Sequence, residues 1–241
     1  MIYKDSRGFY SISSFDHLPI AAAYSCRVLG DMRSVSSRDA FLRLAGSESK
    51  DLIMARQIHG VRVAVVTGDD RGKTLSETDG LVYKKDIVPV VLGVSFADCV
   101  PLLAVDPGRH VIGVAHAGWR GTVNGIATEL VRTMVETGCT AGNIRVSIGP
   151  HIGMCCYTVA EPRVREFQKR FGPDDKIAVA SVGVWHLDIG YVNYMQLLSA
   201  GITKEHIDSP VTCTSCQVAE FNSFRKDSKE TFGVQLGIIR F

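Results

Sequence analysis

Runs of apolar and β-branched residues recur along the chain and predict six β-strands. Some runs alternate apolar and polar positions and others are continuously apolar, which are the patterns of half-buried and fully buried strands. They cover residues 61–66, 88–95, 101–105, 111–116, 144–148 and 232–241. Three strand candidates between residues 88 and 116 are separated only by short turns. This spacing favours a mixed sheet over a regular succession of βαβ units.

Apolar residues at helical spacing predict one strong helix and three weaker ones. The strongest pattern places apolar residues at offsets 0, 3, 4, 7, 8 and 11, which is one face of a helix; they are Val123, Ile126, Ala127, Leu130, Val131 and Met134. Weaker patterns cover residues 36–45, 161–171 and 187–198, and the polar stretch 67–77 predicts an exposed loop. No repeat or linker interrupts the chain. We therefore expect an α/β fold, a single compact domain over residues 1–241 with mixed β-sheets layered between helices.

Composition narrows the classes of function. The 241 residues are 46% hydrophobic, which is enough for a full core. The 27 Lys and Arg nearly balance the 25 Asp and Glu, so no basic footprint predicts nucleic-acid binding. No apolar run approaches the roughly 18 to 20 residues that span a bilayer, so we expect no membrane association. An odd number of cysteines, 7 in so long a chain, favours reduced thiols in a cytoplasmic protein over a disulfide framework.

Three short segments place a soft metal ligand beside the end of a predicted strand. They are Gln57-Ile58-His59-Gly60, Ala97-Asp98-Cys99-Val100-Pro101 and His116-Ala117-Gly118-Trp119-Arg120-Gly121. Thiolate and neutral imidazole are ligands that zinc prefers, and two His with one Cys would leave the fourth tetrahedral position open, as in catalytic sites. Any one such residue is more often an ordinary structural side chain. The separations of 40 and 17 residues between His59, Cys99 and His116 do not match a zinc finger.

The third segment also predicts an anion site. A strand, a Gly-rich turn and a helix start follow one another between residues 111 and 125, and N–H groups at a helix start attract anions. Arg120 lies at that turn, and its guanidinium suits phosphate or carboxylate oxygens. The alternative is that Gly118 and Gly121 only permit a tight turn and that Arg120 only covers Trp119.

Together with further motifs, these segments resemble the laccase-domain family, which is variously called multicopper polyphenol oxidase, purine nucleoside phosphorylase or peptidoglycan editing factor. The resemblance runs in order from about residue 50 to residue 228 and includes Ile148-Gly149-Pro150, Cys155-Cys156-Tyr157, Thr212-Cys213 and Phe221-Asn222-Ser223-Phe224-Arg225. It implies a compact α/β domain with one zinc site. By this resemblance His59, Cys99 and His116 are the metal ligands and catalytic residues. Arg120 and Arg225 match basic positions near the pocket, and Asp79 matches a recurring acidic position.

The resemblance implies phosphorolysis of adenosine-, inosine- or guanosine-type nucleosides, with adenosine deaminase and methylthioadenosine phosphorylase as related activities. The expected partners are a purine nucleoside and phosphate. In this hypothesis Arg120, Arg225 and Asp79 belong to the substrate and phosphate pocket. Asp79 shuttles a proton, and Asp98 could instead orient a metal ligand.

Other functions stay open at this stage. Copper is the alternative metal, but multicopper oxidation of phenols needs more His ligands than the 7 scattered ones supply. Hydrolysis of a peptidoglycan precursor could use the same metal or Cys99 as nucleophile, and a non-enzymatic zinc-binding module would need a fourth ligand. We expect Cys155, Cys156, Cys213 and Cys216 to be structural, because Cys213-Thr214-Ser215-Cys216 lacks a partner pair and neighbouring cysteines in extended backbone point to opposite faces.

Overall fold

The fold is built from two large sheets that face each other. The computed structural model describes residues 1–209, 212–227 and 230–241. One sheet has the order β1-β2-β3-β16-β8-β4-β6, in which β4 runs parallel to both β8 and β6 while the other pairs are antiparallel. Its strands are β1 Ile2–Lys4, β2 Tyr10–Ile12, β3 Ala21–Tyr24, β16 Gln235–Arg240, β8 Val91–Phe96, β4 Leu52–Ala55 and β6 Thr74–Leu75.

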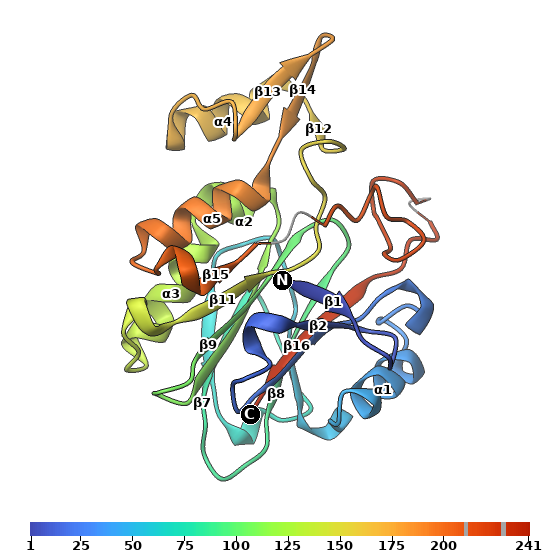
Figure 1. Ribbon diagram of the computed structural model, residues 1–241, viewed down its shortest axis with the longest axis vertical. Coiled ribbons are helices and arrows are strands. Elements are labelled where there is room, and N and C mark those ends of the chain that lie inside the picture. Colours follow the sequence, from blue (N-terminus) through green and yellow to red (C-terminus); the bar gives the residue numbers. More distant parts are fainter. Residues whose placement is uncertain (210–211, 228–229) are drawn as a thin grey trace.

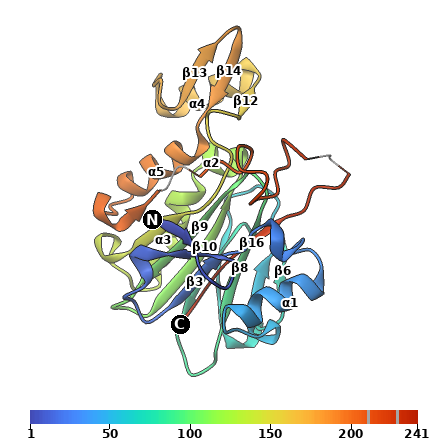
Figure 2. The same ribbon diagram turned by 45° about the vertical axis from the view of Figure 1, so that its right-hand side comes forward.

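The second sheet has the order β15-β11-β9-β10-β7-β5 and is also mixed, since β11–β15 and β5–β7 are parallel pairs. Its strands are β15 Ile207–Asp208, β11 Arg145–Ile148, β9 Val100–Asp106, β10 Val111–Ala117, β7 Gly80–Lys84 and β5 Val63–Val66. A third, antiparallel sheet with α4 stands apart from the layered body in both views (Figures 1 and 2). It consists of β12 Thr158–Val159, β14 Val184–Leu187 and β13 Ala178–Ser181.

One helix, α1, covers the outer face of the first large sheet, α3 and α5 cover that of the second, and α4 lies with the third sheet (Figure 1). Short 3-10 turns join several elements. The helices are α1 Val35–Leu44, α2 Trp119–Asn124, α3 Ile126–Glu136, α4 Glu161–Phe171 and α5 Ile189–Ser199. The 3-10 turns are Ser13–Phe15, Arg27–Leu29, Ser49–Asp51, Gly68–Asp70, Ala141–Asn143 and Lys204–His206. The expectation of an α/β fold with mixed sheets layered between helices is confirmed.

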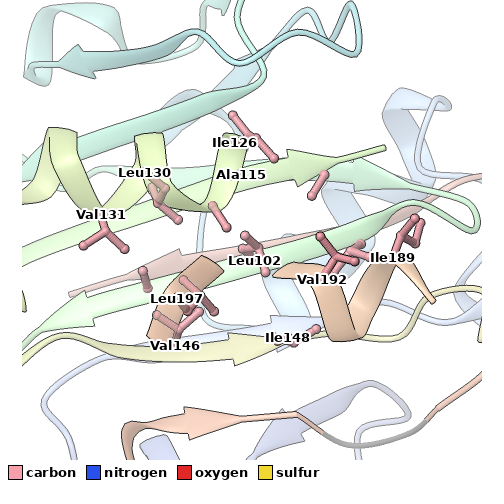
Figure 3. Close-up of a cluster of buried hydrophobic side chains, with 14 of the residues drawn as sticks. Leu102, Ala115, Ile126, Leu130, Val131, Val146, Ile148, Ile189, Val192 and Leu197 are labelled. Atoms are coloured by element: carbon pink, nitrogen blue, oxygen red, sulfur yellow. The ribbon is translucent and has the colours of Figure 1, made fainter. Parts of the chain in front are cut away.

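Three apolar layers hold this arrangement together. Alternate residues of β9 point to opposite layers: Leu102 packs under α3 and α5, whereas Leu103 packs between the two sheets. Figure 3 shows Leu102 and Ala115 of the second sheet beneath Leu130 of α3 and Val192 of α5. A third layer places α1 on the outside of the first sheet. Because both of its faces are covered, β9 is buried along its whole length, which explains its continuous apolar sequence.

The predicted strands and helices occur, most of them with shifted ends and α4 with the predicted ones, and the strongest helix is divided in two. The single helix expected from Val123 to Met134 is interrupted at Gly125, which has a left-handed φ of 97° and ends α2 before α3 begins. Val123 therefore belongs to α2, although it still packs against the same apolar layer. A glycine tolerates this backbone conformation without the clash that a Cβ would cause.

Candidate metal centre and substrate pocket

The structure brings His59, Cys99 and His116 together at one end of the two-sheet sandwich. His59 lies on the loop from β4 to β5 and Cys99 in the turn from β8 to β9, so both loops cross from the first sheet to the second. His116 lies near the end of β10, where the register pairs it with Pro101 and pairs Ala117 with Val100. Strand pairing therefore sets His116 beside the turn that carries Cys99.

The three side chains form a compact set of metal-ligand atoms. One ligand atom from each lies within 4.8 Å of the others, and the Cys99 Sγ is 3.9 Å from the His59 Nε2. The two imidazole rings meet edge to face, with centroids 4.8 Å apart. Zinc bonds of about 2.0–2.3 Å to nitrogen and sulfur fit such a cluster after small movements of the side chains. With three protein ligands, a tetrahedral ion would keep one position for a fourth group.

A buried carboxylate holds two of these ligands in place. Asp79 is fully buried, and its carboxylate accepts the backbone N–H groups of Ile58 (3.1 Å), His59 (2.9 Å) and Gly60 (2.8 Å). The same carboxylate lies 3.0 Å from the Nδ1 of His116. An Nδ1–H that donates to Asp79 leaves the Nε2 lone pair of His116 for a metal.

This position changes the role predicted for Asp79. Its side chain lies behind His116 and does not line the pocket described below, so direct contact with substrate or a proton shuttle to it does not fit the geometry. Burial opposes ionisation of the Asp79 carboxyl, but the hydrogen bonds from His116 and from the backbone hold its pKa below the usual value. Asp79 is instead placed to orient His116 and the His59 loop.

The backbone at Gly118 lies close to the side chains of His59 and Cys99. A Cβ on Gly118 would lie 2.6 Å from the His59 ring and 3.2 Å from the Cys99 sulfur, so a larger residue there would push the ligands. His59 itself has a left-handed φ of 62°, which costs a non-glycine residue about 1–2 kcal/mol. The three N–H bonds to Asp79 offset that cost. The lack of space for a Cβ explains the glycine at position 118.

Cys99 and His116 polarise each other in the metal-free protein. Burial opposes ionisation of the Cys99 thiol, but the His116 imidazolium and hydrogen bonds from both histidines lower its pKa to about 6. Burial likewise disfavours the charged form of His116, but the Cys99 thiolate and Asp79 raise its pKa to about 9. Cys99 is thus poised as a thiolate, the form that binds metal.

A pocket of about 570 Å³ opens over this cluster. His59, Cys99 and His116 lie in its lining, as do the predicted basic residues Arg120 and Arg225. The guanidinium of Arg120 lies over the Trp119 ring at 4.5 Å, so it covers Trp119 and lines the pocket at once. Arg225 is anchored through its Nη1 to the carbonyl of Thr158 at 2.8 Å. The volume suits a ligand of the size of a nucleoside.

Comparison with known proteins places the chain in a family. Residues 24–241 match the family model described as multi-copper polyphenol oxidoreductase laccase. The chain belongs to this laccase family. The resemblance that the three ligand segments suggested is therefore confirmed.

Several members of the laccase family resemble the chain in sequence or in structure. A protein named purine nucleoside phosphorylase YlmD from Geobacillus stearothermophilus is 38% identical over 197 residues, which cover 78% of this chain and 71% of that protein. A protein named adenosine deaminase RL5 from an unknown prokaryotic organism is 33% identical over 212 residues, covering 83% and 80% of the two chains. The crystal structure of YlmD from Geobacillus stearothermophilus superposes with a TM-score of 0.88 at 30% identity, covering 99% of this chain and 98% of that one.

The pocket of this laccase-family chain also contains residues that the sequence did not single out. Arg163 of α4 lies over the Trp119 ring at 4.2 Å, and its Nη1 donates to the Tyr157 hydroxyl at 3.2 Å. The Nε of Arg163 is buried without a hydrogen-bond partner among the described residues. Ile152, Ile189 and Phe232 also line the pocket, together with Gln57 and Phe224 from the quoted motifs. Arg163 follows Pro162 at the start of a weakly amphipathic helix, and nothing in that local pattern distinguishes it from a solvated surface arginine.

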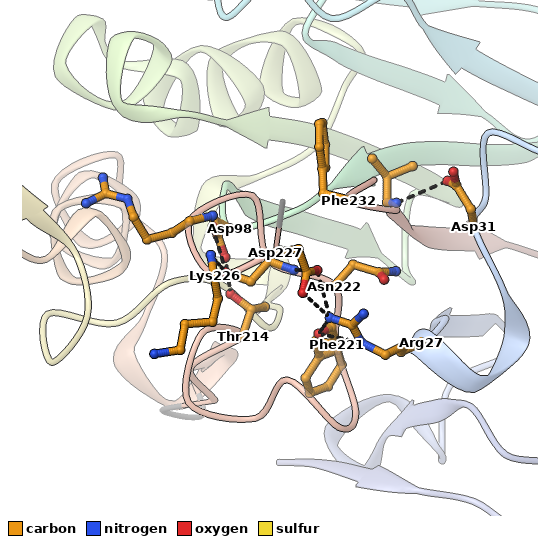
Figure 4. Close-up of polar contacts among 12 residues, drawn as sticks. Arg27, Asp31, Asp98, Thr214, Phe221, Asn222, Lys226, Asp227 and Phe232 are labelled. Atoms are coloured by element: carbon orange, nitrogen blue, oxygen red, sulfur yellow. Dashed lines mark hydrogen bonds and ion pairs between the residues drawn. The ribbon is translucent and has the colours of Figure 1, made fainter. Parts of the chain in front are cut away.

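Asp98 holds the pocket wall, and the alternative in which it orients a metal ligand does not fit its contacts. Its carboxylate accepts the Thr214 hydroxyl at 2.6 Å, the Ser223 hydroxyl at 3.0 Å and the backbone N–H of Arg225 at 2.7 Å. Figure 4 shows Asp98 beside Thr214, with the loop that carries Asn222 and Asp227 next to it. Asp98 therefore ties residues 212–227 to the turn that carries Cys99.

Among the described residues, no helix has the length and apolar character needed to cross a membrane.

Proposed function

We propose that this chain is a zinc-dependent purine nucleoside phosphorylase whose metal is held by His59, Cys99 and His116. The observation that carries the proposal is the position of this three-ligand cluster on the wall of a pocket that also contains three arginines and several aromatic rings. The names of relatives such as YlmD support the same activity. A cytoplasmic location is part of the proposal, since the cluster requires a reduced thiol.

The donor set supports zinc as the metal. One thiolate and two imidazoles with an open position are typical of catalytic zinc, and the buried Asp79 supplies the carboxylate that orients such a histidine. A zinc ion there would supply Lewis-acid chemistry to an oxygen or nitrogen atom of the substrate. Copper is the alternative ion, since the family description refers to copper. The described residues offer one other cluster of possible ligands, and it contains only cysteines.

Three guanidinium groups support an anionic co-substrate. Arg120, Arg163 and Arg225 all line the pocket. A guanidinium offers paired donors in a plane, which match phosphate oxygens. The Nε of Arg163 is buried without an acceptor among the described residues, so a phosphate oxygen could fill that place. Phosphate held by these residues would be positioned to attack the ribose C1′ while the purine leaves. Trp119 and Tyr157 add aromatic surface on which a base can stack.

The test is chromatography of inosine and adenosine after incubation with the zinc-loaded protein, with and without phosphate. Cys99→Ala serves as the control that removes a metal ligand. We expect free hypoxanthine and adenine to appear only with phosphate and to disappear in the control. Release of neither base under any of these conditions would refute phosphorolysis.

Deamination of adenosine is a second candidate activity, supported by the relative named adenosine deaminase RL5. The same chromatogram separates it from phosphorolysis, because inosine would form from adenosine without phosphate. Since the arginines have no evident part in deamination, Arg163→Gln should impair base release and leave inosine formation nearly unchanged. Equal loss of both activities would contradict this division of roles.

A further inference from the structure

Four of the remaining cysteines meet at one point, whereas the sequence predicted no partner pair for Cys213 and Cys216 and opposite faces for Cys155 and Cys156. Cys155 and Cys156 lie in a turn rather than in extended backbone, so their side chains do not point to opposite faces. The sulfur of Cys155 lies 3.5 Å from that of Cys216, and the sulfur of Cys156 lies 3.4 Å from it. With Cys213, all four sulfur atoms lie within 4.8 Å of one another. The pair Cys155-Cys156 is thus the partner that the C-x-x-C segment lacked in the sequence.

We propose that Cys155, Cys156, Cys213 and Cys216 form a second metal site, which takes a zinc ion as a closed tetrathiolate centre. Four thiolates around zinc at about 2.3 Å form a tetrahedron whose edges are about 3.8 Å. The sulfur separations of 3.4 and 3.5 Å and the upper limit of 4.8 Å bracket that edge. Each separation far exceeds the roughly 2.05 Å of a disulfide bond.

The backbone around the cluster favours this set of ligands. The N–H of Gly153 donates to the Cys213 sulfur at 3.3 Å, which is the kind of contact that stabilises a metal-bound thiolate. A side chain at Gly153 would meet the Cys155 sulfur at 3.3 Å and the Cys213 Cβ at 3.4 Å, so glycine leaves room for both ligands. Two backbone bonds between His151 and the neighbours of Cys213 join the segments: His151 N–H to the Thr212 carbonyl and Thr214 N–H to the His151 carbonyl.

Ligand chemistry favours zinc over other divalent ions. Four soft thiolates select zinc over calcium, magnesium or manganese, which prefer oxygen. Binding converts the four thiols to thiolates and releases their protons to solvent, and no electron is transferred. All four coordination positions are occupied by protein, so the ion has no place for a substrate and serves structure.

The site would clamp two segments that build the substrate pocket. Residues 152–157 contribute Ile152 and Tyr157 to the pocket, and residues 212–227 contribute Phe224 and Arg225. The two metal sites share no ligand. The structural site is therefore independent of the proposed activity and can be tested without turnover.

Metal content separates the two sites. We expect about two equivalents of tightly held zinc in the wild-type chain and about one in His59→Ala/Cys99→Ala, because that variant keeps all four cysteines of the second site. Cys213→Ser/Cys216→Ser should lose the second equivalent, whereas the matched pair Cys26→Ser/Cys139→Ser should keep both. Cobalt substituted into His59→Ala/Cys99→Ala should show the strong thiolate-to-metal charge-transfer absorption of a tetrathiolate site.

The unmodified chain gives a test that does not depend on the folding of any variant. Cys155 and Cys216 are exposed, so alkylation in the chelator-treated protein should be fast and zinc should slow it by at least about tenfold. Three results would each overturn the proposal. They are a zinc content of zero in His59→Ala/Cys99→Ala, alkylation that is insensitive to zinc, and a disulfide among the four cysteines in the mass spectrum of protein kept in reducing buffer.

Discussion

Replacement of Asp79 by asparagine tests whether a buried carboxylate organises the metal centre. The carboxylate receives four donors: the N–H groups of Ile58, His59 and Gly60 and the Nδ1 of His116. Asparagine has nearly the same shape but offers an acceptor on one arm only. If its oxygen takes the place that accepts from Ile58 and Gly60, its NH₂ group faces both the His59 N–H and the His116 ring.

Two energetic consequences follow from that conflict. The His59 N–H would lose its acceptor and the other charge-assisted bonds to the carboxylate would weaken, so the metal-free protein should lose about 1–3 kcal/mol of unfolding free energy. An NH₂ facing the Nδ1 of His116 also favours the tautomer with its proton on Nε2, which is the nitrogen needed for metal. Zinc affinity should fall by about 10–100-fold, as for other lost carboxylate–histidine pairs.

The assay combines urea unfolding of the metal-free protein with zinc competition against a chromophoric chelator. Asp106→Asn is a matched control, because Asp106 is also buried and accepts the backbone N–H groups of Gly108 and Arg109 at 3.0 Å each, in the turn between β9 and β10. The control should keep its zinc affinity, and it should also keep both backbone bonds, because both end on one oxygen that asparagine supplies. If Asp79→Asn kept its zinc affinity within about threefold of wild type, the orienting role would be refuted.

The pH dependence of the metal-free protein follows from the same contact. The pKa of Asp79 is lowered in the folded state, so its ionisation contributes stability above the unfolded pKa of about 4, and this contribution is lost as the pH falls through the lower folded value. In Asp79→Asn the acid side of the stability profile should therefore be flatter than in the wild type. Urea midpoints between about pH 3 and pH 6 measure the difference.

Further predictions concern the ligand cluster and the pocket. Gly118→Ala should reduce zinc occupancy of the His59, Cys99 and His116 cluster, since the added Cβ would lie 2.6 Å from His59. Gly142→Ala, whose Cβ meets nothing within 4 Å, should leave the occupancy unchanged, and metal analysis compares the two variants. Arg163→Gln should raise the KM for phosphate by about 10–100-fold through loss of a charged hydrogen bond, as measured by steady-state kinetics; an unchanged KM would exclude contact with phosphate. In the metal-free protein, alkylation of Cys99 followed by peptide mass spectrometry should reach half of its maximal rate near pH 6; a midpoint near pH 9 would contradict the thiolate–imidazolium pair.

The central layers and the ligand cluster could be predicted from the sequence, because both depend on strands with long apolar patterns. The strands β8, β9 and β10 could be predicted, and His59, Cys99 and His116 lie at strand ends where loops meet. The strands β1, β2 and β3 could not, because these segments of three or four residues lie outside any longer apolar or alternating run, unlike the equally short β5 and β11. Their place in the sheet depends on pairing with β16 at the other end of the chain.

Long-range placement explains why Arg163 and the cysteine cluster were missed. Arg163 reaches the pocket because α4 and the third sheet return over α2, which no local pattern reveals. The cysteines meet because a turn at residues 154–156 brings Cys155 and Cys156 to a segment about sixty residues away, as the 61-residue separation of Cys155 and Cys216 shows. Extended backbone was the wrong starting assumption there.

Two buried aspartates hold the segments around Cys99. Asp79 fixes the His59 loop and His116, while Asp98 fixes residues 212–227, which carry Arg225 and the second cysteine pair. Asp98 has a left-handed φ of 77°, a conformation that a non-glycine residue keeps only when its surroundings hold it there. Its bond to Thr214 lies between the two members of the C-x-x-C segment, so the strained turn that positions Cys99 is braced by the same segment that the four cysteines would clamp. A zinc ion in the tetrathiolate site would therefore also stiffen the turn that positions Cys99, and the Thr214 bond is one of the hydrogen bonds that join the two. Thr214→Val removes this bond. The variant should keep the zinc content of both sites, while residues 212–227 are held less firmly to Asp98 at the pocket wall.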